Sequence, residues 1–262
     1  MTAYLPPPRS AGTPGYASLP ASLALPKAAP PALAFGHTSL PASQPPRVGF
    51  AGCATLLTVG LVDEARFTVD ALRRLPWPVA LFVIRARSLA RRQGDRFSLD
   101  SALRPAKLEV LLAAAEGKTT VVELGTGTAW ATAALAIADP QRVIESWDPI
   151  VRPQREAYLA LAGNSVRERI SLVEGFGAEG PREAAGVELL FVDSSHEREP
   201  TIAEVRAWRP ALAPGALIVF DDYGHHLYPG VAEAVAELGA EGEEVASLFL
   251  WHVPAETAAH PS

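Results

Sequence analysis

The sequence predicts an α/β protein built on a doubly wound, mostly parallel sheet. Three observations lead to this prediction. From residue 105 onward, short apolar runs alternate with segments of helical periodicity, which is typical of a parallel sheet covered on both faces. A turn with glycines at 125 and 127 directly follows the first apolar run, and four of the five apolar runs end at an acidic residue. Such residues mark the ligand-binding edge of an open α/β sheet.

The first 47 residues are predicted to be a disordered tail. Eleven of the 24 prolines fall within the first 46 residues, and repeated Pro-Ala and Leu-Pro steps cannot sustain a helix or a sheet ladder. An acid-free start rich in Ser and Ala also fits an organelle transit peptide, but three basic residues in 47 are few for one.

Residues 48–104 are predicted to form a mainly helical segment that covers the pocket of the following domain. Residues 61–75 carry apolar side chains at helical spacing, and Pro76 ends that helix. A second helix is predicted over 79–92. Its arginines suit a solvated helix face, with an anion-binding patch as the alternative. These arginines are Arg85, Arg87, Arg91 and Arg92.

Residues 105–262 are predicted to be the cofactor-binding domain. Its expected strands are 119–124, 142–147, 170–174, 187–192 and 216–220, and its expected helices are 108–115, 129–138, a segment ending near 163, and 201–210. Thr201 and Glu204 have the spacing of a capping box for the last of these helices. Near the C-terminus a single strand is predicted, from Glu244 to Val253.

Charge divides unevenly along the chain. The net charge of −6 is the balance of +3 in residues 1–47, +4 in residues 48–104 and −13 in residues 105–262. A domain that acidic repels phosphate backbones, so a nucleic-acid substrate is disfavoured.

The single cysteine, Cys53, excludes an intramolecular disulfide framework and leaves no thiolate cluster for zinc or iron–sulfur. The longest uncharged apolar stretch, residues 48–62, is shorter than the roughly 20 residues that a bilayer span needs. Neither a membrane segment nor a cleavable secretory signal is indicated. We therefore expect a cytoplasmic protein.

The turn after the first strand is suited to a ligand with positive charge. Gly125 and Gly127 allow the backbone to pass close to a ligand at a helix N-terminus. A dinucleotide-binding turn would have a third glycine where Trp130 stands, and Glu123 suits a cationic ligand better than a phosphate. Asp148, at the end of the next strand, is placed to accept both hydroxyls of a ribose. The alternative for Asp148 is a helix N-cap.

The segment VVELGTGTAW (121–130), with an acid at the end of the second strand, resembles the first motifs of the class I S-adenosylmethionine-dependent methyltransferases. The resemblance implies a Rossmann-like methyltransferase fold, with Glu123, Gly125 and Gly127 around the methionine and sulfonium and Asp148 on the ribose. Many members have an acid after the third strand that contacts adenine. Phe176 stands in the matching stretch and suggests an apolar adenine contact, with a core residue as the alternative.

The fourth and fifth strand ends, FVDSSHEREP (191–200) and LIVFDDYGHH (217–226), resemble small-molecule O-methyltransferases of the catechol and macrolide-sugar type. The resemblance implies that Asp193, Asp221 and Asp222 hold a metal ion. If the strands are neighbours, three carboxylates converge and need a cation or protons, and oxygen ligands suit Mg²⁺ or Mn²⁺. Each acid alone could instead cap a helix or turn.

His196 follows Asp193 by three residues, where the resemblance implies a general base beside the metal. An imidazole with a pKa of about 6.5 suits removal of a proton from a hydroxyl whose acidity a metal has raised. A surface histidine in the first turn of a helix is the alternative interpretation.

Together these features predict an enzyme that transfers a methyl group from S-adenosylmethionine to a hydroxyl oxygen of a small molecule, assisted by Mg²⁺ or Mn²⁺. The Asn/Asp-Pro-Pro-aromatic motif common in base and amide N-methyltransferases does not occur after the fourth strand. Three alternatives stay open: a metal-independent methyltransferase, an NAD(P)-dependent oxidoreductase, which Trp130 disfavours, and a non-catalytic binding protein. The sequence is compatible with a homo-oligomer.

Overall fold

The computed structural model describes residues 70–254. The predicted tail (1–47), the first part of the cover segment and Cys53 lie outside the described residues. Of the helix predicted over 61–75, residues 61–69 also lie outside them, and residues 70–74 are helical.

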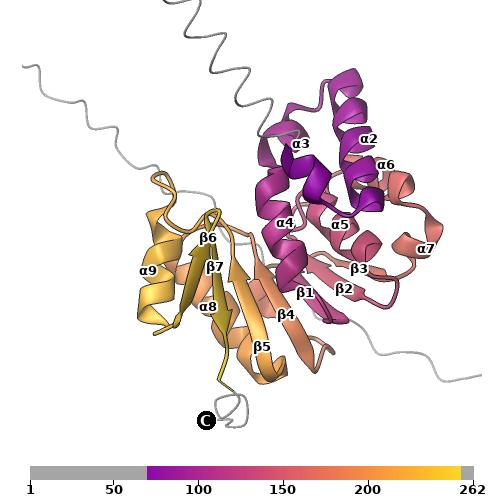
Figure 1. The fold of residues 1–262 in the computed structure, drawn as a ribbon. Coiled ribbons are helices and arrows are strands. Elements are labelled where there is room, and N and C mark those ends of the chain that lie inside the picture. Colours follow the sequence, from indigo (N-terminus) through magenta and orange to yellow (C-terminus); the bar gives the residue numbers. More distant parts are fainter. Residues whose placement is uncertain (1–69, 255–262) are drawn as a thin grey trace, which may run out of the picture. The chain divides into compact units, whose positions relative to one another are not determined.

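A seven-stranded sheet forms the centre of the described part, in the order β3-β2-β1-β4-β5-β7-β6. All neighbours from β3 to β5 are parallel, and β7 runs antiparallel to both β5 and β6. The predicted doubly wound, mostly parallel sheet is therefore confirmed (Figure 1). The strands are β1 Thr120–Leu124, β2 Val143–Trp147, β3 Ile170–Val173, β4 Val187–Val192, β5 Leu212–Phe220, β6 Gly242–Val245 and β7 Leu248–His252.

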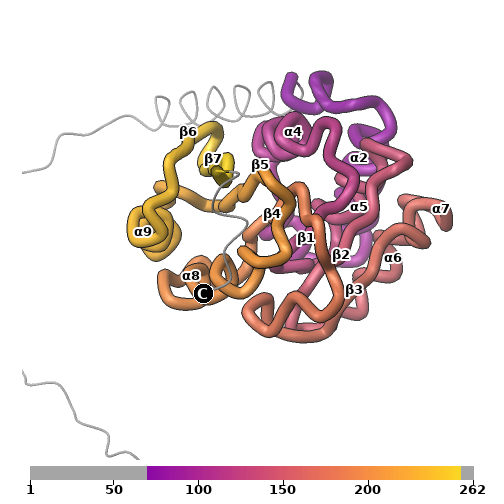
Figure 2. Tube along the Cα trace, turned by 90° about the horizontal axis from the view of Figure 1, so that it is seen from below, coloured from indigo at the N-terminus to yellow at the C-terminus, as the bar shows by residue number. Residues whose placement is uncertain are grey.

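Helices cover both faces of this sheet. From Trp77 onward the helices are α2 Trp77–Gln93, α3 Arg96–Ser101, α4 Pro105–Ala114, α5 Trp130–Ala138, α6 Gln154–Ala162, α7 Asn164–Arg167, α8 Arg198–Trp208 and α9 Pro229–Glu237. Figure 2 shows α8 and α9 on one side of the strands and α2, α4 and α5 on the other. The central strands β1 and β4 are buried on both faces, which explains why they appear in the sequence as continuous apolar runs.

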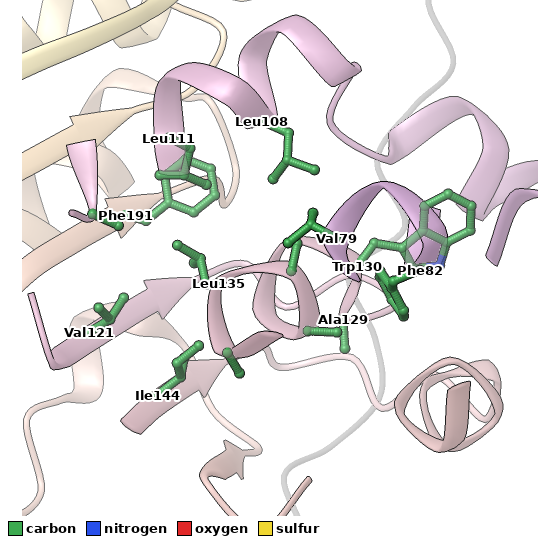
Figure 3. Packing of buried hydrophobic residues seen from close by; sticks show 14 of the residues in the cluster. Val79, Phe82, Leu108, Leu111, Val121, Ala129, Trp130, Leu135, Ile144 and Phe191 are labelled. Atoms are coloured by element: carbon green, nitrogen blue, oxygen red, sulfur yellow. The ribbon is translucent and has the colours of Figure 1, made fainter. Parts of the chain in front are cut away.

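One core lies between the sheet and the helices α2, α4, α5 and α6. Figure 3 shows Leu111 of α4 and Leu135 of α5 lying over the strand residues Val121 and Phe191, all of them fully buried or nearly so. This packing fixes α4 next to the sheet, which matters for the site because α4 carries Lys107.

A second core lies on the opposite face, between the sheet and helices α8 and α9. Trp147 at the end of β2 and Trp208 of α8 are both fully buried and meet edge to face, with ring centroids 5.7 Å apart. Large aromatic pairs of this kind contribute through both area and geometry. They hold α8 beside the strand ends that form the site.

Two predicted boundaries are wrong. Helix α8 begins at Arg198, so Thr201 and Glu204 are buried within the helix and do not form a capping box at its start. The C-terminal region holds two strands, β6 and β7, joined by Ala246 and Ser247, rather than one strand. Both linking residues have positive φ, as a two-residue hairpin turn requires, but neither is the Asn or Gly that would have indicated one.

Within residues 70–254, every helix is too short or too polar to cross a lipid bilayer.

Candidate functional site

A cavity of about 1070 Å³ lies at the carboxyl ends of the parallel strands. All nine residues predicted for the site line it, and they come from the ends of the parallel strands or the turns after them. They are Glu123, Gly125, Gly127, Asp148, Phe176, Asp193, His196, Asp221 and Asp222. The sheet therefore brings together residues that are up to 99 positions apart in the sequence.

The turn after β1 requires glycine at position 125 for a reason that the sequence did not reveal. Gly125 has a φ of +104°, and a Cβ atom there would lie 1.8 Å from the backbone oxygen of Asp193. The backbone of Asp193 is held close because its N–H donates to the Leu124 oxygen at 2.8 Å. Gly125 thus allows the ends of β1 and β4 to meet.

Trp130 is the first residue of α5, where a dinucleotide-binding turn would have its third glycine. The residue is 7% exposed, and its ring meets Tyr158 edge to face, with centroids 5.2 Å apart. The start of α5 is therefore filled by a bulky side chain, as expected for a turn that does not bind a pyrophosphate.

Glu123 is fully buried, and its Oε2 accepts hydrogen bonds from the hydroxyls of Thr132 and Ser146. Burial raises the pKa of Glu123 to about 7, although these hydrogen bonds oppose the rise. Glu123 is one of the residues that line the cavity. Its hydroxyl partners ensure that it keeps one orientation.

Asp148 is held by several donors. Its Oδ2 accepts from the Gly127 N–H at 2.9 Å and from Arg155 Nη2 at 2.6 Å, and its Oδ1 accepts from the Ile150 N–H at 2.7 Å. Arg155 also donates to the backbone oxygens of Gly127 and Ile150. Asp148 therefore ties the glycine turn to the loop after β2, and a carboxylate with about four acceptor sites keeps capacity for a further donor.

Sequence reasoning missed Arg155, which is 5% exposed and lies on α6. Burial lowers its pKa, and the charge of Asp148 opposes that change. An arginine in a helix of mixed polarity gives no sequence signal for such a role, because only the fold places it against the end of β2.

Phe176 is 63% exposed and lines the cavity. The alternative that Phe176 is a core residue is therefore wrong. A large apolar ring left open to solvent beside a cavity is available to pack against an apolar or aromatic part of a ligand.

The acidic residues after β4 and β5 converge, as their strands are neighbours in the sheet. Asp193, His196 and Asp221 each offer a ligand atom, and these atoms all lie within 4.8 Å of one another. His196 Nε2 lies 3.3 Å from Asp193 Oδ1 and 3.7 Å from Asp222 Oδ2. A separation beyond about 10 Å would have excluded a shared site.

The clustering changes the proton affinity of these groups. Burial raises the pKa of Asp193 well above its usual range, and the negative charge of Asp221 adds to the rise. Burial lowers the pKa of His196, but the hydrogen bond and charge of Asp193 outweigh burial, so the pKa lies above its ordinary value. The backbone of His196 and Asp222 has positive φ, 58° and 54°, a left-handed conformation that is uncommon for residues other than glycine.

Lys107 is the second residue that sequence reasoning missed. It lies on α4, and its Nζ contacts Asp221 Oδ1 at 2.7 Å and Asp222 Oδ1 at 2.5 Å. Burial lowers the pKa of Lys107, but the charges and hydrogen bonds of the two aspartates raise it above its ordinary value. The contacts span 114 and 115 positions in the chain, so no local pattern could have indicated them.

One wall next to His196 is aromatic. The His196 ring stacks on Tyr228 with centroids 4.8 Å apart, Tyr228 stacks on His225 at 5.0 Å, and His225 stacks on His226 at 4.9 Å. His225 and Tyr228 line the cavity. The imidazole of His196 is therefore held between this stack and the carboxylates.

Comparison with known proteins is consistent with this site. Residues 122–223 match a family described as a methyltransferase domain, a span that runs from β1 through Asp193, His196 and the aspartates after β5. Among curated proteins, none matches the chain. The match confirms the resemblance to S-adenosylmethionine-dependent methyltransferases, and it favours a methyltransferase over a dinucleotide-dependent oxidoreductase.

Solved structures of methyltransferases are similar to this chain at low sequence identity. A protein from Klebsiella pneumoniae, assigned as an O-methyltransferase, is 18% identical with a TM-score of 0.50, over 65% of this chain and 89% of its own. CalS11, a TDP-rhamnose 3'-O-methyltransferase of calicheamicin biosynthesis, is 19% identical with a TM-score of 0.46, over 73% of this chain and 93% of its own. A methyltransferase from Geobacter sulfurreducens is 19% identical with a TM-score of 0.48, over 65% and 87%.

Proposed function

We propose that this protein transfers a methyl group from S-adenosylmethionine to a hydroxyl oxygen of a small molecule. The observation that carries the proposal is a single cavity with two different sides. One side holds the glycine turn and Asp148, and the other holds His196 among three carboxylates. A methyl donor and an acceptor hydroxyl can therefore lie next to each other, and methyl transfer needs little beyond such alignment.

On the cofactor side, S-adenosylmethionine supplies a methyl group on a positively charged sulfur. Asp148, whose carboxylate Arg155 and the Gly127 N–H orient, is placed to accept from a ribose. Phe176 offers its exposed ring to an adenine. The acidic lining favours the cationic cofactor over the neutral product that remains after transfer.

On the acceptor side, the donor set fits a divalent cation. The ligand atoms of Asp193, His196 and Asp221 are close enough to surround one ion, and Asp222 lies beside them. Oxygen ligands from Asp193, Asp221 and Asp222 would hold Mg²⁺ or Mn²⁺, which supplies charge that makes a hydroxyl more acidic.

His196 is the proposed general base. Its Nε2 is buried at the cavity and lies 3.3 Å from Asp193 Oδ1, but within the described residues it makes no hydrogen bond of good geometry. Asp193 and the Tyr228 ring fix the imidazole, so that Nε2 can receive the proton of an acceptor hydroxyl. Asp193 then stabilises the resulting imidazolium.

The helices before β1 form part of the same cavity. Phe97 and Asp100 of α3 line it, as does Leu103. These residues belong to the predicted cover segment, and they would select the acceptor molecule. A small-molecule acceptor matches a cavity of this size.

A metal-independent methyltransferase is the second candidate, and Lys107 favours it. Its ammonium already neutralises part of the charge of Asp221 and Asp222, so these carboxylates depend less on a metal ion for charge balance.

The test is methyl transfer from radiolabelled S-adenosylmethionine to a panel of hydroxyl compounds. His196→Gln should lower kcat by about 10² to 10⁴, whereas His226→Gln should not, because His226 does not line the cavity. Undiminished activity of the His196 variant would contradict the assigned base. If activity persists after metal ions are removed with EDTA and also in the Asp221→Ala variant, the metal-independent candidate is supported.

A further inference from the structure

Asp193, Asp221 and Asp222 form an acidic cluster that is already paired with a cationic side chain of the protein. Lys107 Nζ lies 2.7 Å from Asp221 Oδ1 and 2.5 Å from Asp222 Oδ1. The three side chains are only 15%, 8% and 19% exposed. An ion pair this far from solvent is screened much less than a surface pair.

These contacts use the oxygens that a divalent ion would need. Asp221 is one of the three residues whose ligand atoms come together, and Asp222 is the neighbouring carboxylate. A metal ion coordinated by the same Oδ1 atoms would lie about 2 to 2.5 Å from them. Two positive charges cannot share that space, because their repulsion in a partly buried site is large.

The lysine side chain can leave without any change of fold. Leu108 and Leu111 of α4 are buried in the core, so the helix itself stays in place. The Lys107 side chain, in contrast, lines the cavity and ends in a flexible four-carbon stem. A rotation of that stem would move the ammonium away from the two carboxylates.

We infer that Lys107 is the resident cation of the cluster, and that a divalent ion binds Asp193, Asp221 and Asp222 only by displacing the Lys107 ammonium from Asp221 and Asp222. This inference rests on the metal-assisted form of the proposed function. Lys107 is then a determinant of metal affinity. Its ammonium also balances the charge of Asp221 and Asp222 when no metal ion is bound.

Isothermal titration with Mn²⁺ alone tests the inference on the full chain. Lys107→Met removes the competing charge and keeps most of the length of the stem, so Mn²⁺ affinity should rise by about tenfold or more. Lys107→Arg keeps the charge and should bind Mn²⁺ as weakly as the unmodified protein. Asp221→Asn added to Lys107→Met should abolish the gain. Equal or weaker affinity in Lys107→Met would overturn the inference.

A second measurement needs no variant and covers the case in which Lys107→Met fails to fold. Reductive methylation followed by mass spectrometry should label Lys107 several-fold faster when Mn²⁺ is bound, because the ammonium is then released. Lys118, which precedes β1 at the opposite end of the sheet, is the internal control. Bound Mn²⁺ without faster labelling of Lys107 would overturn the inference.

Binding of S-adenosylhomocysteine separates this inference from the proposed function. If the protein and Lys107→Met both bind S-adenosylhomocysteine but neither binds Mn²⁺, the inference is wrong and methyl transfer stands. If neither binds S-adenosylhomocysteine, the proposed function fails irrespective of Lys107.

Discussion

Ion pairs between buried side chains hold individual residues of the site in place. Arg155 neutralises Asp148 on the cofactor side, and Lys107 pairs with Asp221 and Asp222 on the acceptor side. Each pair joins a helix to the end of a strand. Breaking such a pair leaves a buried charge without a partner, which is more harmful than losing an exposed salt bridge.

Arg155→Met should therefore lower the free energy of unfolding by about 3 kcal/mol, because the carboxylate of Asp148 remains buried without its cation. Urea denaturation measures this difference. Arg206→Met is the matched control, since Arg206 pairs with Glu237 at 3.7 Å and is 68% exposed, and it should change stability by less than about 1 kcal/mol. Equal effects of the two substitutions would contradict the proposed importance of the Asp148–Arg155 pair.

Glu123 predicts a pH dependence of stability. Its pKa is about 7 in the folded protein against an ordinary value of 4.5, so the folded state holds the proton more tightly than the unfolded state. The associated stability is fully present below pH 4.5 and is lost as the pH rises to about 7. The loss amounts to at most about 3 kcal/mol.

Glu123→Gln removes this proton uptake while the amide oxygen can still accept from Thr132 and Ser146. The variant should gain stability relative to the original protein as the pH rises from about 5 to about 8, as measured by urea denaturation across that range. Titrating groups that do not interact with Glu123 affect both proteins equally and cancel in the difference, whereas Asp193, whose pKa the charge of Glu123 helps to raise, contributes to it. A difference between the two proteins that does not change with pH would contradict the assigned pKa.

The site depends on how closely the ends of β1 and β4 approach each other. The Gly125 turn passes directly over the backbone of Asp193. Because both atoms involved would be backbone or Cβ, no side-chain movement can relieve a clash there.

Gly125→Ala should prevent folding or destabilise the protein by more than about 3 kcal/mol, since its Cβ would lie 1.8 Å from the Asp193 oxygen. Gly117→Ala is the control: Gly117 also has positive φ, but its Cβ would meet nothing within 4 Å, so a loss of about 1 kcal/mol is expected. Soluble yield and thermal unfolding by circular dichroism compare the two. A Gly125→Ala protein as stable as the control would contradict the close approach.

The β6–β7 hairpin gives a prediction of the opposite sign. Ala246 and Ser247 both have positive φ, 54° and 63°, a conformation that Asn and Gly adopt more readily. The double substitution Ala246→Asn with Ser247→Gly should raise the melting temperature by about 2 to 4 °C, which corresponds to roughly 1 kcal/mol. A lower melting temperature would contradict this account of the turn.

The central strands and the acidic residues at their ends could be predicted because a buried parallel strand appears in the sequence as a continuous apolar run. Asp148, Asp193 and Asp221 are recognisable as the residues that follow apolar runs. The β6 strand shows no apolar run because all its residues are exposed, and the turn that follows it contains neither Gly nor Asn. The start of α8 was misplaced because Thr201 and Glu204 imitate a cap within a helix.

Lys107 and Arg155 could not be predicted, because each acts through a contact that only the fold creates. Lys107 meets its partners across more than 100 residues, and Arg155 belongs to a helix whose charge pattern resembles a solvated one. The sequence therefore indicates which side chains could bind a ligand, but it does not indicate which other side chains of the protein pair with them.

The fold places part of the chain's negative charge at one edge of the sheet. The net charge of −13 over residues 105–262 includes the strand-end acids, and these gather at one edge of the sheet. Part of the excess of acid thus lies where a cationic cofactor and a metal ion would bind, next to the cationic side chains of Arg155 and Lys107, which balance some of it.

Isothermal titration with S-adenosylhomocysteine, with and without Mg²⁺, measures whether the cavity binds the proposed cofactor. We predict one site per chain, with affinity lowered about tenfold or more in Asp148→Asn, because the charged acceptor for the ribose is weakened. Lack of S-adenosylhomocysteine binding by the folded protein, or binding of NAD(H) in its place, would contradict the assignment as an S-adenosylmethionine-dependent methyltransferase.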